Sequence, residues 1–255
     1  MMNESPSCAL AKVPAVTLGF WVIKILATTL GETAGDTLSM SYDMGYLVST
    51  AIFVVPLLAL VSAQIRARQY HPFLYWAAIV ASTTAGTTMA DFATRSLGIG
   101  YPGGALLLAG CVAVSLAAWK AVLGSVSVET VGTPRSEVFY WLTITFSQTL
   151  GTAVGDWAAD DGGFGYLGGA MLFGGLLLAL VVLWKKTRMS PVLLFWSAFI
   201  LTRPLGATVG DFLDKPFAHG GLDLSRPMAS AALGATMIVL ILILPQRAGR
   251  HVAAA

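Results

Sequence analysis

The sequence predicts an all-helical membrane protein with eight transmembrane helices, arranged as four parallel helical-hairpin repeats. The chain of 255 residues is 56% hydrophobic and only 11% charged, whereas soluble domains carry about 25% charged residues. Its apolar residues form eight long runs, and a polar pattern recurs four times along the chain. These features exclude soluble globular, disordered, collagen-like and disulfide-rich proteins.

Each predicted span is an apolar run of about 20 residues, the length that a helix needs to cross the hydrocarbon core. The spans are expected at 15–38, 44–64, 72–94, 101–123, 136–158, 164–184, 191–213 and 227–245. They leave no room for a separate soluble domain. We therefore expect a first membrane half at 1–123, a cytoplasmic linker at 124–135 and a second membrane half at 136–255.

Lysine and arginine residues predict the orientation, because cytoplasmic loops are enriched in them. Ten lie on one side of the predicted spans: Lys12, Arg66, Arg68, Lys120, Arg135, Lys185, Lys186, Arg188, Arg247 and Arg250. Three lie on the other side: Arg95, Lys215 and Arg226. The first side should be cytoplasmic, together with both termini. Long helical runs, rather than alternating strands, favour a bacterial inner (plasma) membrane.

The chain repeats itself four times. An aromatic residue followed by Trp marks each copy, at Trp21, Trp76, Trp141 and Trp196, and an Asp follows each Trp after fifteen residues. The spacing between successive Trp residues is 55, 65 and 55. Because each unit contains two spans, every unit enters the membrane from the same side, which makes the repeats parallel.

These residues resemble a bacterial membrane-protein family defined by four tandem copies of a repeat of unknown function. Each repeat of that family contains two transmembrane regions and a characteristic tryptophan. The resemblance extends from KVPAVTLGFWVIK at 12–24 to the last span, and 202–206 resembles the signature of the fourth repeat. It implies this architecture but no settled activity.

A polar stripe runs along the first helix of each repeat. Positions 7, 11 and 15 after each Trp share one helix face. They are Thr28, Glu32 and Asp36; Thr83, Thr87 and Asp91; Gln148, Thr152 and Asp156; and Arg203, Ala207 and Asp211. Exposure of these groups to lipid would be costly, so the stripe should face protein or a wet cavity.

Small residues accompany the stripe one and five positions before each Asp. The glycines are Gly31, Gly35, Gly86, Gly151, Gly155, Gly206 and Gly210. Such pairs allow helix backbones to approach closely, so we expect these glycines at helix contacts.

Lys24 and Arg203 lie inside predicted spans. They could neutralise buried carboxylates, with Arg203 pairing with Glu32 or Asp36, since arginine binds carboxylates through two parallel hydrogen bonds. Alternatively, Arg203 could bind an anionic substrate, and Lys24 could take part in a proton relay.

The favoured function is transport of a small cation, such as Mn²⁺, Mg²⁺ or H⁺, and exchange of a metal ion for protons is one form that this transport could take. The expected ion-binding residues are Glu32, Asp36, Asp91, Asp156, Asp211, Thr28, Thr87, Gln148 and Thr152, and the four aspartates are the candidate metal ligands. Oxygen ligands suit hard cations. The alternatives are a non-transporting scaffold or sensor and a small organic-anion transporter.

We expect no catalytic site and no cofactor, because the sequence has no metal-ligand pair of His or Cys and no phosphate-binding loop. The expected partners are the lipid bilayer and a small ion or small molecule. Nucleic acid is not an expected partner, because the chain lacks a basic external domain. The oligomeric state stays open.

Overall fold

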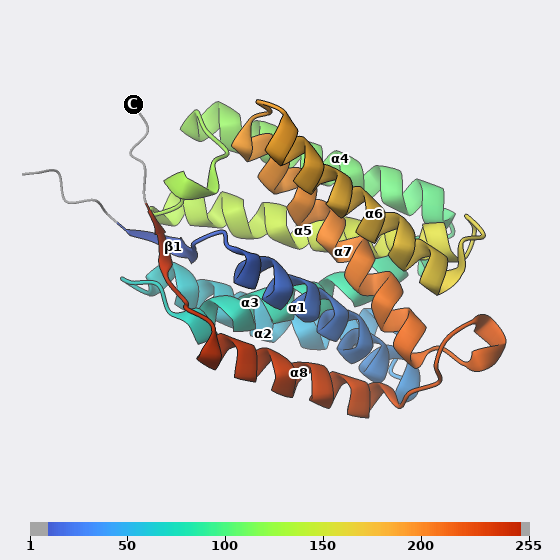
Figure 1. The fold of residues 1–255 in the computed structure, drawn as a ribbon. Helices are drawn as coiled ribbons and strands as arrows, with labels where there is room; N and C mark the ends of the chain where they lie inside the picture. Colours follow the sequence, from blue (N-terminus) through green and yellow to red (C-terminus); the bar gives the residue numbers. More distant parts are fainter. Residues whose placement is uncertain (1–9, 251–255) are drawn as a thin grey trace, which may run out of the picture.

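The computed structural model describes residues 10–250, which fold into long helices and one pair of short strands (Figure 1). Residues 1–9 and 251–255 of the two predicted membrane halves lie outside this part. The long helices begin and end close to the predicted spans. They are α1 (Leu18–Asp36), α2 (Tyr46–Arg66), α3 (Pro72–Asp91), α4 (Gly100–Leu123), α5 (Pro134–Ala159), α6 (Gly165–Lys186), α7 (Pro191–Asp214) and α8 (Arg226–Ile243).

Short helical segments follow some of these helices. Two π-helical segments extend α1 and α3, at Thr37–Ser41 and Phe92–Ser96. Two 3₁₀ turns lie in connections, at Val128–Thr130 and Phe217–His219.

Several helices are long and apolar enough to cross a membrane, which indicates a membrane protein. Within residues 10–250 there are five such helices, namely α2, α4, α6, α7 and α8. The remaining long helices, α1, α3 and α5, carry buried Thr, Ser and acidic side chains, which lower their hydropathy.

The odd-numbered helices form a closed ring at the centre of the molecule. α1 packs against α3 and α7, and α5 packs against the same two helices. Each even-numbered helix lies outside the ring and packs most extensively on the odd helix of the following repeat: α2 on α3, α4 on α5 and α6 on α7. α8 packs on α1 and closes the circle, so every repeat is held by its neighbours.

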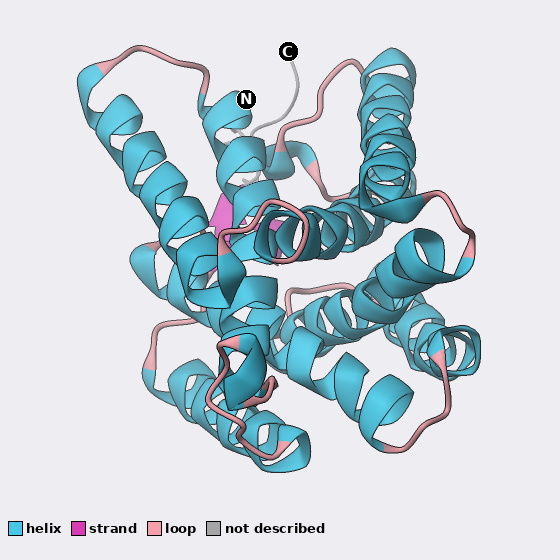
Figure 2. Cartoon of the chain, turned by 90° about the vertical axis from the view of Figure 1, so that its right-hand side faces the viewer, coloured by secondary structure: helices cyan, strands magenta, loops and turns pink. Residues whose placement is uncertain are grey.

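Aromatic side chains close one end of the ring. The residue before each Trp packs against the Trp of the next repeat, and the ring centroids lie 5.5–6.5 Å apart. The pairs are Phe20 with Trp76, Tyr75 with Trp141, Tyr140 with Trp196, and Phe195 with Trp21. The ends of the odd helices that carry the repeated aspartates meet on the opposite side of the ring, which faces the viewer in Figure 2. The four odd helices therefore run in the same direction.

The two described chain ends meet beside the aromatic end. Strand β1 (Leu10–Pro14) pairs antiparallel with β2 (Ala248–Arg250), which the sequence patterns did not predict. Lys12 anchors β1 to α5 through Glu137, with an Nζ–Oε1 distance of 2.6 Å.

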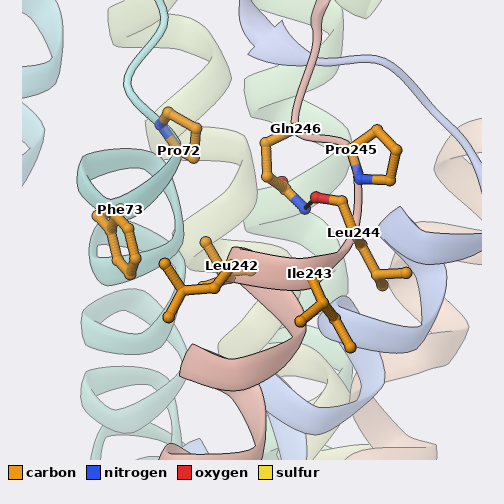
Figure 3. A pocket seen from close by; sticks show the side chains of 8 residues that line it. Pro72, Phe73, Leu242, Ile243, Leu244, Pro245 and Gln246 are labelled. Carbon is orange, nitrogen blue, oxygen red and sulfur yellow. Dashed lines mark hydrogen bonds between the residues drawn. The ribbon is translucent and has the colours of Figure 1, made fainter.

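An open apolar pocket lies between the start of α3 and the end of α8 (Figure 3). The Gln246 side chain lies beside it and accepts a hydrogen bond from Trp76 Nε1 over 3.1 Å. This bond ties the segment after α8 to the aromatic layer.

Candidate functional site

The four repeated aspartates come together at the end of the ring opposite the aromatic layer. Asp36, Asp91, Asp156 and Asp211 lie at or near the C-terminal ends of the odd helices, and each is at most 3% exposed. A carboxylate at a helix C-terminus opposes the helix dipole, so each aspartate needs a positive partner. Two basic side chains supply partners, each bridging two repeats.

Arg95 bridges the second and third repeats. Its Nε lies 2.9 Å from Asp91 Oδ1, and its Nη2 lies 3.4 Å from Asp156 Oδ2 and 3.8 Å from Asp160 Oδ2. The hydroxyl of Tyr101 donates a hydrogen bond to Asp160 over 2.7 Å.

Lys215 bridges the fourth and first repeats. Its Nζ lies 3.0 Å from Asp211 Oδ1 and 2.7 Å from Asp36 Oδ2. A shift of 120 residues carries Asp91 and Arg95 onto Asp211 and Lys215. The two bridges are thus related by the internal repeat of the chain.

Lys215 lies just beyond the end of α7 and is largely buried. Burial by itself would lower the pKa of its ammonium group. The carboxylates of Asp211, Asp36 and Asp214 outweigh that effect and hold the pKa of Lys215 well above its ordinary value. Lys215 is therefore positively charged at neutral pH.

Arg226 adds a third basic group to this end. Its Nε lies 3.4 Å from Asp214 Oδ1 and 3.9 Å from Asp36 Oδ2. All three basic residues predicted on the minority side, Arg95, Lys215 and Arg226, therefore contact the acidic end of the ring.

Arg203 and Glu32 form a buried ion pair one turn deeper. Arg203 Nη1 lies 2.9 Å from Glu32 Oε2, which is one of the two pairings expected from the sequence. Arg203 also donates hydrogen bonds to Thr87 Oγ1 over 2.6 Å and to the carbonyl oxygens of Thr28 and Thr83 over 3.2 and 3.4 Å. One guanidinium thus joins three helices of the ring.

Lys24 lies deeper still and is fully buried. Its Nζ donates to Gln148 Oε1 over 3.3 Å and lies 4.2 Å from the centre of the Phe199 ring. Within residues 10–250, no carboxylate lies within 4.0 Å of this amine. Gln148 Nε2 and the Thr152 hydroxyl are also buried, and neither has a hydrogen-bond partner within residues 10–250.

The predicted packing glycines lie at contacts between the odd helices. A Cβ added to Gly206 would overlap the Thr28 side chain, and one added to Gly210 would lie 2.8 Å from Glu32 Cβ. The same relation joins each repeat to the next, with Gly31 against Thr83, Gly35 against Thr87, Gly86 against Gln148, Gly151 against Arg203 and Gly155 against Ala207.

Three carboxylates are close enough together to hold one metal ion. Glu32, Asp36 and Asp211 each place a carboxylate oxygen within 4.8 Å of the other two. This group differs from the predicted set of four aspartates. Asp91 and Asp156 face Arg95 instead, and Glu32 takes part in their place.

Sequence reasoning did not assign Arg95, Lys215 and Arg226 to the site. The signal for the first two is a basic residue four positions after the Asp, which occurs in the second and fourth repeats only. This spacing puts the two side chains on one helix face. Arg226 carries no such local signal, because it reaches the acidic end from the start of α8.

Comparison with protein families gives four matches, to a family described as a Repeat of Unknown Function (DUF347), at residues 19–70, 74–124, 139–190 and 194–247. Each match begins two residues before the Trp of its repeat. Comparisons with curated proteins and with solved structures give no match. The chain therefore belongs to the family defined by this repeat and carries four tandem copies of it.

Proposed function

We propose that the chain is an integral membrane transporter of a small cation, with its eight long helices as spans and its four repeats as parallel units. The even helices support this proposal, because they expose apolar side chains such as Leu106 and Leu178. We place it in a bacterial inner membrane with both termini in the cytoplasm. The halves at 1–123 and 136–255, joined by the cytoplasmic linker 124–135, are the proposed units of organisation.

The observation that carries the proposal is the excess of carboxylates over basic groups. At the acidic end of the ring and one turn deeper, six buried carboxylates share only four basic ion-pair partners, Arg95, Arg203, Lys215 and Arg226. The six are Glu32, Asp36, Asp91, Asp156, Asp211 and Asp214. When these ten groups are ionised, their net charge is −2, which one divalent cation or two protons would balance; the buried Lys24 contacts none of the six carboxylates and is not counted.

The chemistry of the ligands favours a hard cation. Glu32, Asp36 and Asp211 offer only oxygen atoms, which suit Mg²⁺ and Mn²⁺. Proton exchange is a natural means of coupling, because a carboxylate must lose its proton before it binds a metal ion.

A scaffold or sensor is the second candidate, supported by hydrogen bonds between the ring helices. Thr28 donates to the Thr202 carbonyl over 3.1 Å, and Thr87 donates to the Gly31 carbonyl over 3.1 Å. These threonines would then serve only to join helices. The organic-anion alternative has less support, because Arg203 is already engaged by Glu32 and by three further acceptors.

Cation binding by the purified full-length protein tests the proposal. We expect Mn²⁺ or Mg²⁺ to bind to the wild type, more weakly as the pH falls. Asp211→Asn should weaken binding about tenfold or more, because one of three ligand carboxylates is lost. Asp156→Asn is the matched control, since it alters a buried aspartate at the same repeat position outside the three-carboxylate group.

Isothermal titration at two pH values measures binding, and uptake of Mn²⁺ by vesicles containing the protein measures transport. Failure of the wild type to bind either ion at both pH values would refute the divalent-cation proposal. Binding without uptake would instead favour the sensor.

A further inference from the structure

We propose that Lys215 is a tethered cation that occupies the ion site between the first and fourth repeats and must leave before a metal ion binds there. This inference rests on the proposed function. It adds a regulatory element to the same site, namely an internal competitor for the transported ion.

The position of the ammonium group supports this role. Lys215 Nζ lies between Asp36 Oδ2 and Asp211 Oδ1, at 2.7 and 3.0 Å, and both aspartates belong to the three-carboxylate group. The two carboxylate oxygens that contact the ammonium group would be free to contact a metal ion once that group has left. Because Lys215 lies in the connection after α7 and ends a flexible four-carbon stem, it can swing away while the helices stay in place.

One further atom shows that the ammonium group does not complete the site. Asp36 Oδ1 is buried and has no hydrogen-bond partner within residues 10–250. A buried polar atom without a partner is costly, so Asp36 Oδ1 remains available to a ligand that carries more charge than one ammonium group.

The internal repeat supplies a comparison within the same chain. At the equivalent bridge, Arg95 replaces Lys215, and a 120-residue shift puts Thr152 in the position of Glu32. The Arg95 bridge therefore has the hydroxyl of Thr152 at the position where the Lys215 bridge has the carboxylate of Glu32. Its guanidinium is planar, always charged and contacts Asp91 and Asp156 through different nitrogen atoms, so it is displaced less readily. We therefore assign one site of cation exchange to each chain, where the first and fourth repeats meet.

Lys215→Gln tests the inference by titration of the purified full-length protein with Mn²⁺ and Mg²⁺. Removing the competing charge should tighten binding about tenfold, whereas Arg95→Gln, the matched variant at the other bridge, should change it less. Wild-type binding with an unchanged affinity in Lys215→Gln would overturn the competitor role but leave the proposed function standing. Absence of binding in both proteins would overturn the proposed function itself, and the competitor role with it.

A second measurement uses the wild type alone and does not depend on how the variants fold. Displacement should expose the Lys215 amine, so its labelling by an amine-reactive reagent, followed by mass spectrometry, should speed up several-fold with Mn²⁺. Lys186, which is exposed at the end of α6, provides the internal reference. Labelling of Lys215 that stays constant or slows while Mn²⁺ binds would contradict the proposal.

Discussion

Arg203 and Glu32 show how a single ion pair organises the centre of the ring. Both side chains are almost completely buried, and their closest nitrogen and oxygen atoms lie 2.9 Å apart. Taking two charges out of water is costly, so the pair need not stabilise the fold relative to apolar residues. Removing only one member of the pair destabilises the fold, because the other charge then stays buried without its partner.

Replacing Arg203 with Met should therefore destabilise the protein by about 3–5 kcal/mol. The double variant Arg203→Met with Glu32→Gln should recover much of this loss, because no unpaired charge remains. Thermal unfolding in detergent measures both effects. Arg66→Met, at an exposed position at the end of α2, should change stability by no more than about 0.5 kcal/mol. Equal destabilisation by the single and double Arg203 variants would contradict this account.

The helices of the ring approach one another through small residues. Gly31, Gly151 and Gly206 lie against the Thr, Arg and Thr side chains found seven residues after the Trp of the next repeat. A larger side chain at these positions meets the neighbouring helix. The even helices contain glycines without such contacts, including Gly174 in α6.

Gly206→Ala and Gly174→Ala should therefore have opposite effects. The new Cβ at residue 206 would overlap Thr28, and overpacking of this kind costs about 1–3 kcal/mol. At residue 174 the Cβ enters open space, and the helix gains up to about 1 kcal/mol because Ala restricts the unfolded chain. Melting temperatures in detergent report both changes. A loss of stability at residue 174 equal to that at residue 206 would remove the packing argument.

The whole molecule is a circular array in which each repeat is completed by the next. α8 packs on α1 as α2 packs on α3, and the aromatic pairs pass around the same circle. The array has two unlike ends, one aromatic and one acidic. Orientation in a membrane therefore decides which solution the acidic end faces.

Single cysteines at Asp161 and Lys186 test the proposed orientation, in a protein whose Cys8 and Cys111 are replaced by Ser. Both positions are exposed, the first in the connection before α6 and the second at the end of α6. In intact cells, a membrane-impermeant thiol reagent should label residue 161 and not residue 186. The reverse pattern would invert the orientation, and labelling of both would contradict a span between them.

The sequence by itself determined the helices, the four repeats and the burial of the polar stripe, because these depend on local hydropathy and helical periodicity. It also predicted that Gly206 and Gly210 lie at helix contacts, and it gave pairing of Arg203 with a buried acid as one alternative beside the binding of an anionic substrate. Only the folded chain decided which neighbours meet. The pairing of β1 with β2 joins residues more than 230 positions apart, and no local pattern marks it.

The tertiary structure also decided the composition of the acidic site. Four aspartates at one repeat position are equivalent in sequence, yet Asp36 and Asp211 join Glu32 while Asp91 and Asp156 surround Arg95. The physical reason is that a basic side chain four residues after the Asp occurs in alternate repeats and bridges to the next helix of the ring. The partner of each carboxylate is therefore determined by the order of helices around the ring, which the sequence pattern alone does not specify.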